Sequence, residues 1–162
     1  MTLPAGEAAA ATVLGEWYAG EVGGEALFWR LAELAEPAAT RKWLALAAVE
    51  ARVAERLLQV LLAHDLPVPP TAASLEWAQT CAGQYAPRPW REQMAWLGEI
   101  AQQALDSMRR EAAGLAAPYA PIGEVVVRHE ELLVEFARRE LAGDAAGARL
   151  LVEEFLATTP RT

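Results

Sequence analysis

Ionisable side chains fall at positions of otherwise apolar helical stripes where a hydrophobic residue is expected. Apolar residues that recur at steps of three and four predict amphipathic helices. Continuing these steps places Glu21 and Glu25 on the stripe of the first predicted helix, Glu50 on the second and His129 on the fourth. Because an unpaired buried charge is costly, such groups must find partners. Carboxylates and imidazole can share protons with one another or bind a divalent transition-metal ion.

Each of these side chains also has an ordinary structural interpretation. Glu21, Glu25 or Glu50 can bury its aliphatic stem at the edge of a stripe and extend its carboxylate into solvent. His129 can be a core histidine that hydrogen-bonds to a neighbour. We expect the groups to converge because they lie near the middle of three separate predicted helices.

The helices that would position these groups follow from composition and from breaks at proline and glycine. Alanine and leucine account for 36 and 22 of the 162 residues, and both residue types favour helices. Asp144 can cap a short C-terminal helix that runs through Phe155. The four core helices of the predicted single domain, 1–162, span about residues 8–36, 39–64, 90–114 and 121–142.

The connections between these helices constrain the topology. The first two helices are joined by a few residues around Pro37, so they must form an antiparallel hairpin. Residues 65–88 contain several prolines and predict a long connection, with a turn or two of helix near Ser74–Trp77, that can retrace the length of a core helix. Short, long and short connections predict an all-α four-helix bundle with one crossover between the second and third helices.

The inward polar residues resemble those of the ferritin-like carboxylate proteins, such as rubrerythrins and bacterioferritins. That family has a Glu on the first and third helices and a Glu-x-x-His pair on the second and fourth. Glu21 or Glu25 resembles the lone Glu on the first helix of the family. The second helix has Glu50-Ala51-Arg52-Val53, with valine at the histidine position, and the fourth has Val126-Val127-Arg128-His129, with valine at the glutamate position.

The departures from the family pattern limit what the resemblance implies. The third helix has no acid on its apolar stripe, and Gln103 is the nearest polar alternative. A di-iron centre with about six ligands is therefore not expected. The resemblance implies either no cofactor or one divalent Fe, Mn or Zn ion held by Glu21 or Glu25, Glu50 and His129, with Glu130 as a further ligand. In a metal-free cluster, the carboxylates would share protons with His129 or pair with Arg52 or Arg128.

Charge and composition exclude several classes of partner. The net charge of −8 and the scattered cations, 13 Arg and one Lys, argue against nucleic-acid binding. No charge-free stretch is long enough to span a membrane, and the single Cys81 cannot form an internal disulfide. We expect a cytoplasmic protein, and the bias towards Ala and Arg is typical of bacteria. Trp29 and Trp96 lie off their helical stripes and indicate a homodimer interface.

Two classes of function are consistent with these features. The first is a binding or assembly module with structural inward carboxylates and no working di-iron centre. The second is a metal-dependent oxidoreductase with a reduced Glu/His ligand set. The segment His129-Glu130-Glu131-Leu132-Leu133 is not a zincin motif, because Leu133 replaces the second histidine. A pocket for an apolar ligand, lined by Met94, Met108 and tryptophans, has no distinctive support in the sequence.

Overall fold

Residues 5–161 are described by a computed structural model of the chain. They form six α-helices and one short 3-10 helix, η1, and contain no β-strand, which confirms the all-α prediction. Residues 1–4 and 162, which the predicted domain also included, lie outside the described residues. The elements are α1 (Ala5–Leu34), α2 (Pro37–Ala63), α3 (Ala72–Tyr85), α4 (Trp90–Ala113), η1 (Ala117–Tyr119), α5 (Ala120–Leu141) and α6 (Ala145–Thr158).

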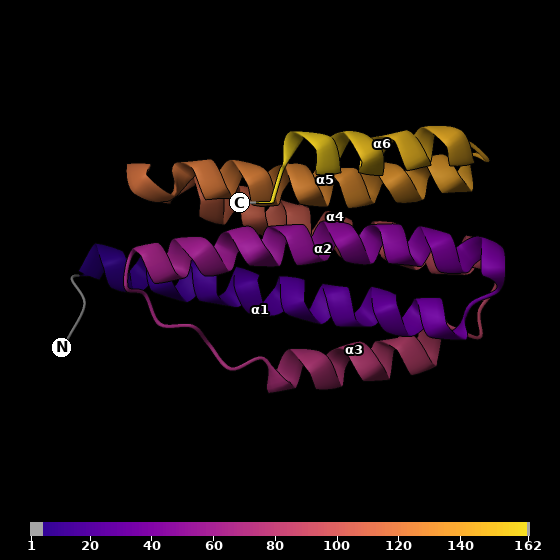
Figure 1. The fold of residues 1–162 in the computed structure, drawn as a ribbon, viewed down its shortest axis with the longest axis horizontal. Helices are drawn as coiled ribbons and strands as arrows, with labels where there is room; N and C mark the ends of the chain where they lie inside the picture. The colour runs from indigo at the N-terminus through magenta and orange to yellow at the C-terminus, as the bar shows by residue number, and fades with distance from the viewer. Residues whose placement is uncertain (1–4, 162) are drawn as a thin grey trace.

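The four long helices form two pairs that lie along a common direction (Figure 1). Helices α1 and α2 pack along their length, and α4 and α5 do the same. Only Ala35 and Glu36 separate α1 from α2, and Pro37 occupies the first position of α2, where its missing N–H costs no hydrogen bond. The predicted antiparallel hairpin is therefore present. Helix α2 also contacts α5, which joins the two pairs.

The long connection contains a complete helix, so the prediction of only a turn or two in this segment is wrong. Helix α3 spans Ala72–Tyr85 and packs along α1. Its only fully buried residues are Ala78 and Ala82, one turn apart. Such a narrow, small-residue contact leaves no strong apolar stripe in the sequence. The prolines that indicated a loop lie before and after the helix, at positions 67–70 and 87–89.

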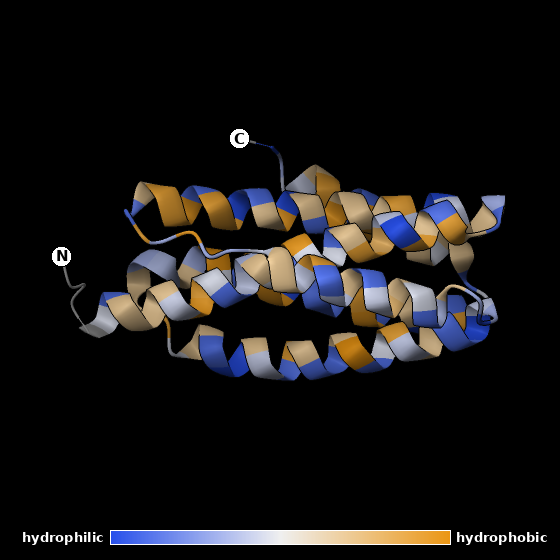
Figure 2. Cartoon of the chain, turned by 90° about the horizontal axis from the view of Figure 1, so that it is seen from below, coloured by the Kyte–Doolittle hydropathy of each residue, from blue (hydrophilic) through white to orange (hydrophobic). Residues whose placement is uncertain are grey.

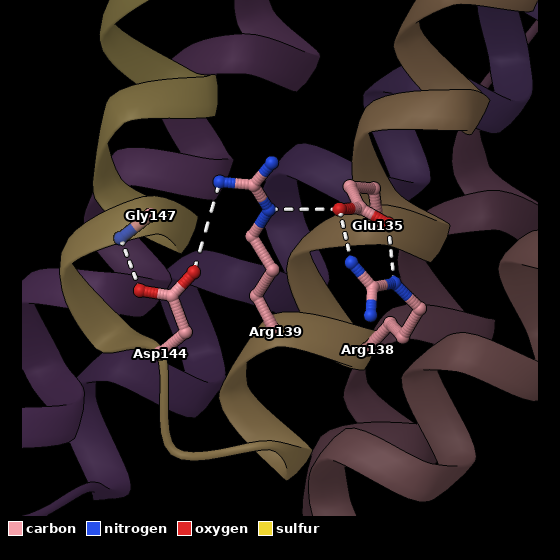
Figure 3. A network of polar contacts seen from close by, with 5 residues as sticks. All are labelled: Glu135, Arg138, Arg139, Asp144 and Gly147. Atoms are coloured by element: carbon pink, nitrogen blue, oxygen red, sulfur yellow. Dashed lines mark hydrogen bonds and ion pairs between the residues drawn. The ribbon is translucent and has the colours of Figure 1, made fainter.

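Helix α6 packs against α5 and α2, on the opposite side of the molecule from α3 (Figure 1). Asp144 Oδ1 accepts a hydrogen bond from the Gly147 backbone N–H at 2.9 Å, which confirms the predicted cap. Arg139 in the last turn of α5 contacts the cap, with Nη1 3.7 Å from Asp144 Oδ2, and its Nε donates to Glu135 of the same helix at 2.8 Å (Figure 3). These contacts fix the turn that sets α6 against α5.

Hydrophobic and hydrophilic residues are interspersed along the helices (Figure 2). No helix within residues 5–161 combines the length and apolarity needed to cross a membrane. Trp29 is 52% exposed, whereas Trp96 is partly buried and stacks on Tyr85 with ring centroids 3.9 Å apart. The homodimer inferred from these two tryptophans stays a prediction.

Candidate metal centre

Three helices bring a carboxylate or an imidazole to one point in the interior, as the sequence predicted. Glu21 comes from α1, Glu50 from α2 and His129 from α5, and their exposed fractions are 2%, 3% and 1%. His129 Nε2 lies 2.9 Å from Glu50 Oε1, and His129 Nδ1 lies 3.3 Å from Glu21 Oε2. One imidazole ring therefore bridges two carboxylates from two other helices.

The apolar stripes of α2 and α5 explain why these side chains point inward. Glu50 lies between the buried Leu46 and Val53, and His129 lies between the buried Val126 and Leu132. Burying the rest of each stripe removes a large apolar area from water. The free energy gained along the stripe thus offsets the cost of burying one ionisable group on it.

Glu130 belongs to the same cluster, and Glu25 does not. Glu130 is 5% exposed, and its Oε1 lies 3.9 Å from His129 Nδ1. One ligand atom each from Glu21, His129 and Glu130 lies within 4.8 Å of the other two. Glu25, the sequence alternative to Glu21, is only partly buried and lies outside this group. The geometry thus selects one of the two candidate glutamates on α1 and adds the residue that follows the histidine.

No lysine or arginine within residues 5–161 forms an ion pair with this cluster. The candidate partners named from the sequence lie elsewhere: Arg52 donates to the Thr159 carbonyl, and the Arg128 guanidinium lies over the Phe155 ring, 5.9 Å from its centroid. Of the two arrangements predicted for a metal-free cluster, pairing with Arg52 or Arg128 is therefore wrong, and proton sharing with His129 stays a prediction. Three buried carboxylates face a single imidazole, so positive charge is deficient even when His129 is protonated.

Burial and mutual repulsion change the proton affinities of these groups. Burial raises the pKa of Glu50 well above its ordinary value, and His129 opposes that shift. Burial likewise raises the pKa of Glu130 to about 7. Burial alone would lower the pKa of His129, but Glu21 and Glu50 raise it well above its ordinary value. The metal-free cluster consequently retains protons at neutral pH.

The two nitrogens of His129 have different surroundings. This difference indicates which nitrogen could bind a metal ion and which is paired with a supporting carboxylate. Nε2 pairs with Glu50, whereas Nδ1 has no hydrogen-bond partner and faces Glu21 and Glu130. Both oxygens of Glu21 and Oε2 of Glu130 are also buried and make no hydrogen bond, although Glu21 Oε2 lies 3.3 Å from His129 Nδ1. Histidine ligands of metals commonly donate their second N–H to a carboxylate. The unpartnered atoms of Glu21, His129 and Glu130 therefore fit one metal ion, with Glu50 orienting the imidazole.

A second metal ion lacks ligands. Val53 and Val126 occupy the missing histidine and glutamate positions, and both are fully buried in the hydrophobic core. Gln103, the polar alternative on α4, is exposed and is not among the residues of the buried cluster. Within the described residues the donor set therefore suits a single ion.

Glycines on α1 provide the space that the cluster needs. A Cβ atom at Gly24 would lie 2.3 Å from Glu50 Oε2, so any other residue there would displace that carboxylate. At Gly23, a Cβ atom would lie 3.1 Å from the Ser74 Cβ, because α3 packs closely against α1 there. Close approach thus involves Glu50 at Gly24 and Ser74 of α3 at Gly23.

A cavity of about 460 Å³ adjoins the cluster, and no sequence motif indicates it. Glu21, Glu50 and Glu130 line it, and it lies between α1, α3 and α4. Met108 and Trp77 contribute to its wall, whereas Met94 is buried elsewhere in the core. The signal in the sequence was small residues on both walls, with Gly20 and Gly24 on α1 and Ala101 and Ala104 on α4. Small residues on facing helices leave volume between them.

The chain matches no protein-family model, no curated protein and no solved structure. A function for this protein must therefore be argued from the chemistry of the cluster and the cavity beside it.

Proposed function

We propose that this chain is a ferritin-like four-helix bundle that binds one divalent transition-metal ion and acts as a metal-dependent oxidoreductase. Glu21, His129 and Glu130 would be the protein ligands, and Glu50 would hold the imidazole in place. The observation that carries the proposal is the set of buried, unpartnered ligand atoms on Glu21, His129 Nδ1 and Glu130. The pairing of α1 with α2 and of α4 with α5, joined by a long crossover, supports the fold assignment.

Electrostatics favours a cation at this point. Buried carboxylates are stable when they are paired, hydrogen-bonded or bound to a metal, and here three of them share one imidazole. A divalent ion would supply the positive charge that no lysine or arginine in the described part of the chain provides through an ion pair. Two carboxylate oxygens and one imidazole nitrogen form a ligand set suited to Fe, Mn or Zn.

The ion would supply redox or Lewis-acid chemistry, and the chain's own residues would determine access to it. Three protein ligands leave coordination positions open, which is characteristic of catalytic metal sites. The carboxylates of the cluster line the adjacent cavity, so a molecule in that cavity would approach the ligands directly. The buried wall excludes bulk water from the remaining sides.

Metal stoichiometry tests this proposal. Protein purified without chelator is analysed by inductively coupled plasma mass spectrometry, and metal-free protein is titrated with Fe(II), Mn(II) and Zn(II). We expect about one ion per chain and a loss of binding in Glu21→Gln, His129→Gln and Glu130→Gln. Matched controls are Glu25→Gln on α1 and Glu131→Gln on α5, which change the same residue type outside the cluster and should bind metal normally.

A second candidate function has its own structural support. The complete burial of Val53 and Val126 shows that two ligand positions of the family pattern are filled with packing residues. A binding or assembly module whose carboxyl groups remain protonated would tolerate the absence of these two metal ligands. Protein that stays metal-free in all three titrations, and whose cluster variants change only stability, would establish this alternative and refute the metal site.

A further inference from the structure

The cavity beside the carboxylates connects the protein surface with the buried cluster. Gly20, Ala73 and Trp77 line it and are exposed, and they belong to α1 and α3. Glu50, Glu130 and Leu97 also line it and are buried. A molecule entering past these exposed residues would therefore reach the cluster without unfolding any helix.

The wall of the cavity specifies the chemistry of its ligand. Apart from the three glutamates and Ser74, every lining residue is apolar or glycine. The side of α4 that faces the cavity contributes only aliphatic side chains and Met108. Apolar walls with a few convergent polar groups are typical of small-molecule sites, and a volume of about 460 Å³ lies within their usual range.

The charge at the buried end restricts the ligand further. Within residues 5–161 no lysine or arginine pairs with Glu21, Glu50 or Glu130, so an anionic group buried beside them would find no lysine or arginine to balance its charge. A neutral molecule with a terminal hydroxyl group can donate a hydrogen bond to a carboxylate there and bury its hydrocarbon chain along α4. Such a molecule matches both the carboxyl groups at the buried end and the apolar wall of the cavity.

We propose that the cavity between α1, α3 and α4 binds a neutral, largely hydrocarbon small molecule with its polar end at Glu21, Glu50 and Glu130. Binding depends on the cavity alone. That this molecule is the substrate of the metal ion rests on the proposed function. The two statements are tested separately, because ligand binding can be measured on metal-free protein.

Gly20 provides a variant that fills the entrance with little risk to folding. It lies in the middle of α1, and a Cβ atom there would have no neighbouring atom within 4 Å. Replacing glycine by leucine inside a helix also improves helix propensity. Gly83 on α3 is the matched control, since a Cβ atom there would also meet nothing within 4 Å and the residue does not line the cavity.

The test is calorimetric titration of metal-free protein with 1-octanol. Octanoate, an anion of equal chain length, is the comparison probe. We expect saturable binding of one octanol per chain and at least tenfold weaker binding of octanoate at pH 8. Gly20→Leu should weaken octanol binding at least tenfold, and Gly83→Leu should leave it unchanged. Ala104→Leu, on the opposite wall, is a second variant expected to weaken binding.

Several results would overturn the inference. They are the absence of saturable octanol binding, binding that survives both Gly20→Leu and Ala104→Leu, and octanoate binding as tight as that of octanol. Octanol binding to a chain that takes up no metal would refute the proposed oxidoreductase and leave this inference intact. Stoichiometric metal binding without octanol binding would refute this inference and leave the proposed metal site intact.

Discussion

His129 Nε2 lies 2.9 Å from Glu50 Oε1, although 79 residues separate them in the chain. This contact joins α2 to α5 and leaves His129 Nδ1 facing Glu21 and Glu130. In the proposed metal site, Glu50 would therefore orient the imidazole and would not be a ligand equivalent to Glu21. The distinction between a supporting carboxylate and a ligating one has measurable consequences.

The first prediction concerns the separate roles of Glu50 and Glu21. Glu50→Gln should weaken metal binding by about 10- to 100-fold, the usual effect of changing a partner of a histidine ligand. Glu21→Gln should cause a larger loss, because it removes a ligand atom. Competition with a chromophoric chelator measures both affinities. Equal losses in the two variants would show that Glu50 ligates the ion directly.

The second prediction compares two glycines one turn apart on α1. Gly20→Ala should stabilise the chain by about 0.5–1 kcal/mol, because it gains helix propensity and meets no neighbour. Gly24→Ala should lack this gain, because its Cβ atom would displace the Glu50 carboxylate from His129. Urea denaturation gives the two unfolding free energies. Equal stabilisation in both variants would mean that Glu50 relocates without cost.

Periodicity was sufficient to predict the long helices and the inward direction of Glu21, Glu50 and His129. Each lies on a stripe whose other members are strongly apolar, so its orientation follows from burial of those neighbours. Helix α3 was missed because only Ala78 and Ala82 are buried on it. Two small residues produce little hydrophobic contrast, and the flanking prolines indicated a loop.

The finer features of the site depend on contacts between helices, which spacing along one helix does not encode. Glu21 and Glu25 lie one turn apart, and only the position of α5 decides which of them meets His129. The cavity arises where small residues of α1 and α4 face each other. Neither helix alone indicates that space. Arg52 likewise has a partner that no local pattern specifies, the carbonyl of Thr159 after α6.

The third prediction concerns the cap of α6. Asp144→Ala should destabilise the chain by about 1 kcal/mol, because Gly147 N–H loses its acceptor and Arg139 loses a charged neighbour. Asp144→Asn is the matched control and should retain most of the stability, since asparagine caps a helix about as well. Thermal or urea denaturation measures the difference. Equal destabilisation by both substitutions would assign the effect to the lost ion pair between Asp144 and Arg139 and not to the cap.

The last prediction concerns the pH dependence of metal-free protein. In the folded chain the pKa of Glu130 is about 7, above its ordinary value of 4.5, so folding favours the protonated carboxyl group. Stability from this group is complete below about pH 4.5 and is lost as the pH rises to about 7. His129 acts in the same direction at higher pH, because its pKa is raised above 6.5 and its charged form is favoured in the folded chain.

Urea denaturation between pH 4.5 and 8 measures this loss. Glu130→Gln removes one titrating carboxyl group and should make the decline up to about pH 7 shallower, while the raised pKa of Glu50 maintains part of it. Glu131→Gln is the control, because Glu131 is exposed and pairs with Arg109 at the surface, away from the cluster. It should keep the slope of the unmodified chain. If Glu130→Gln and the unmodified chain lose stability in parallel over this range, Glu130 does not hold its proton in the folded state.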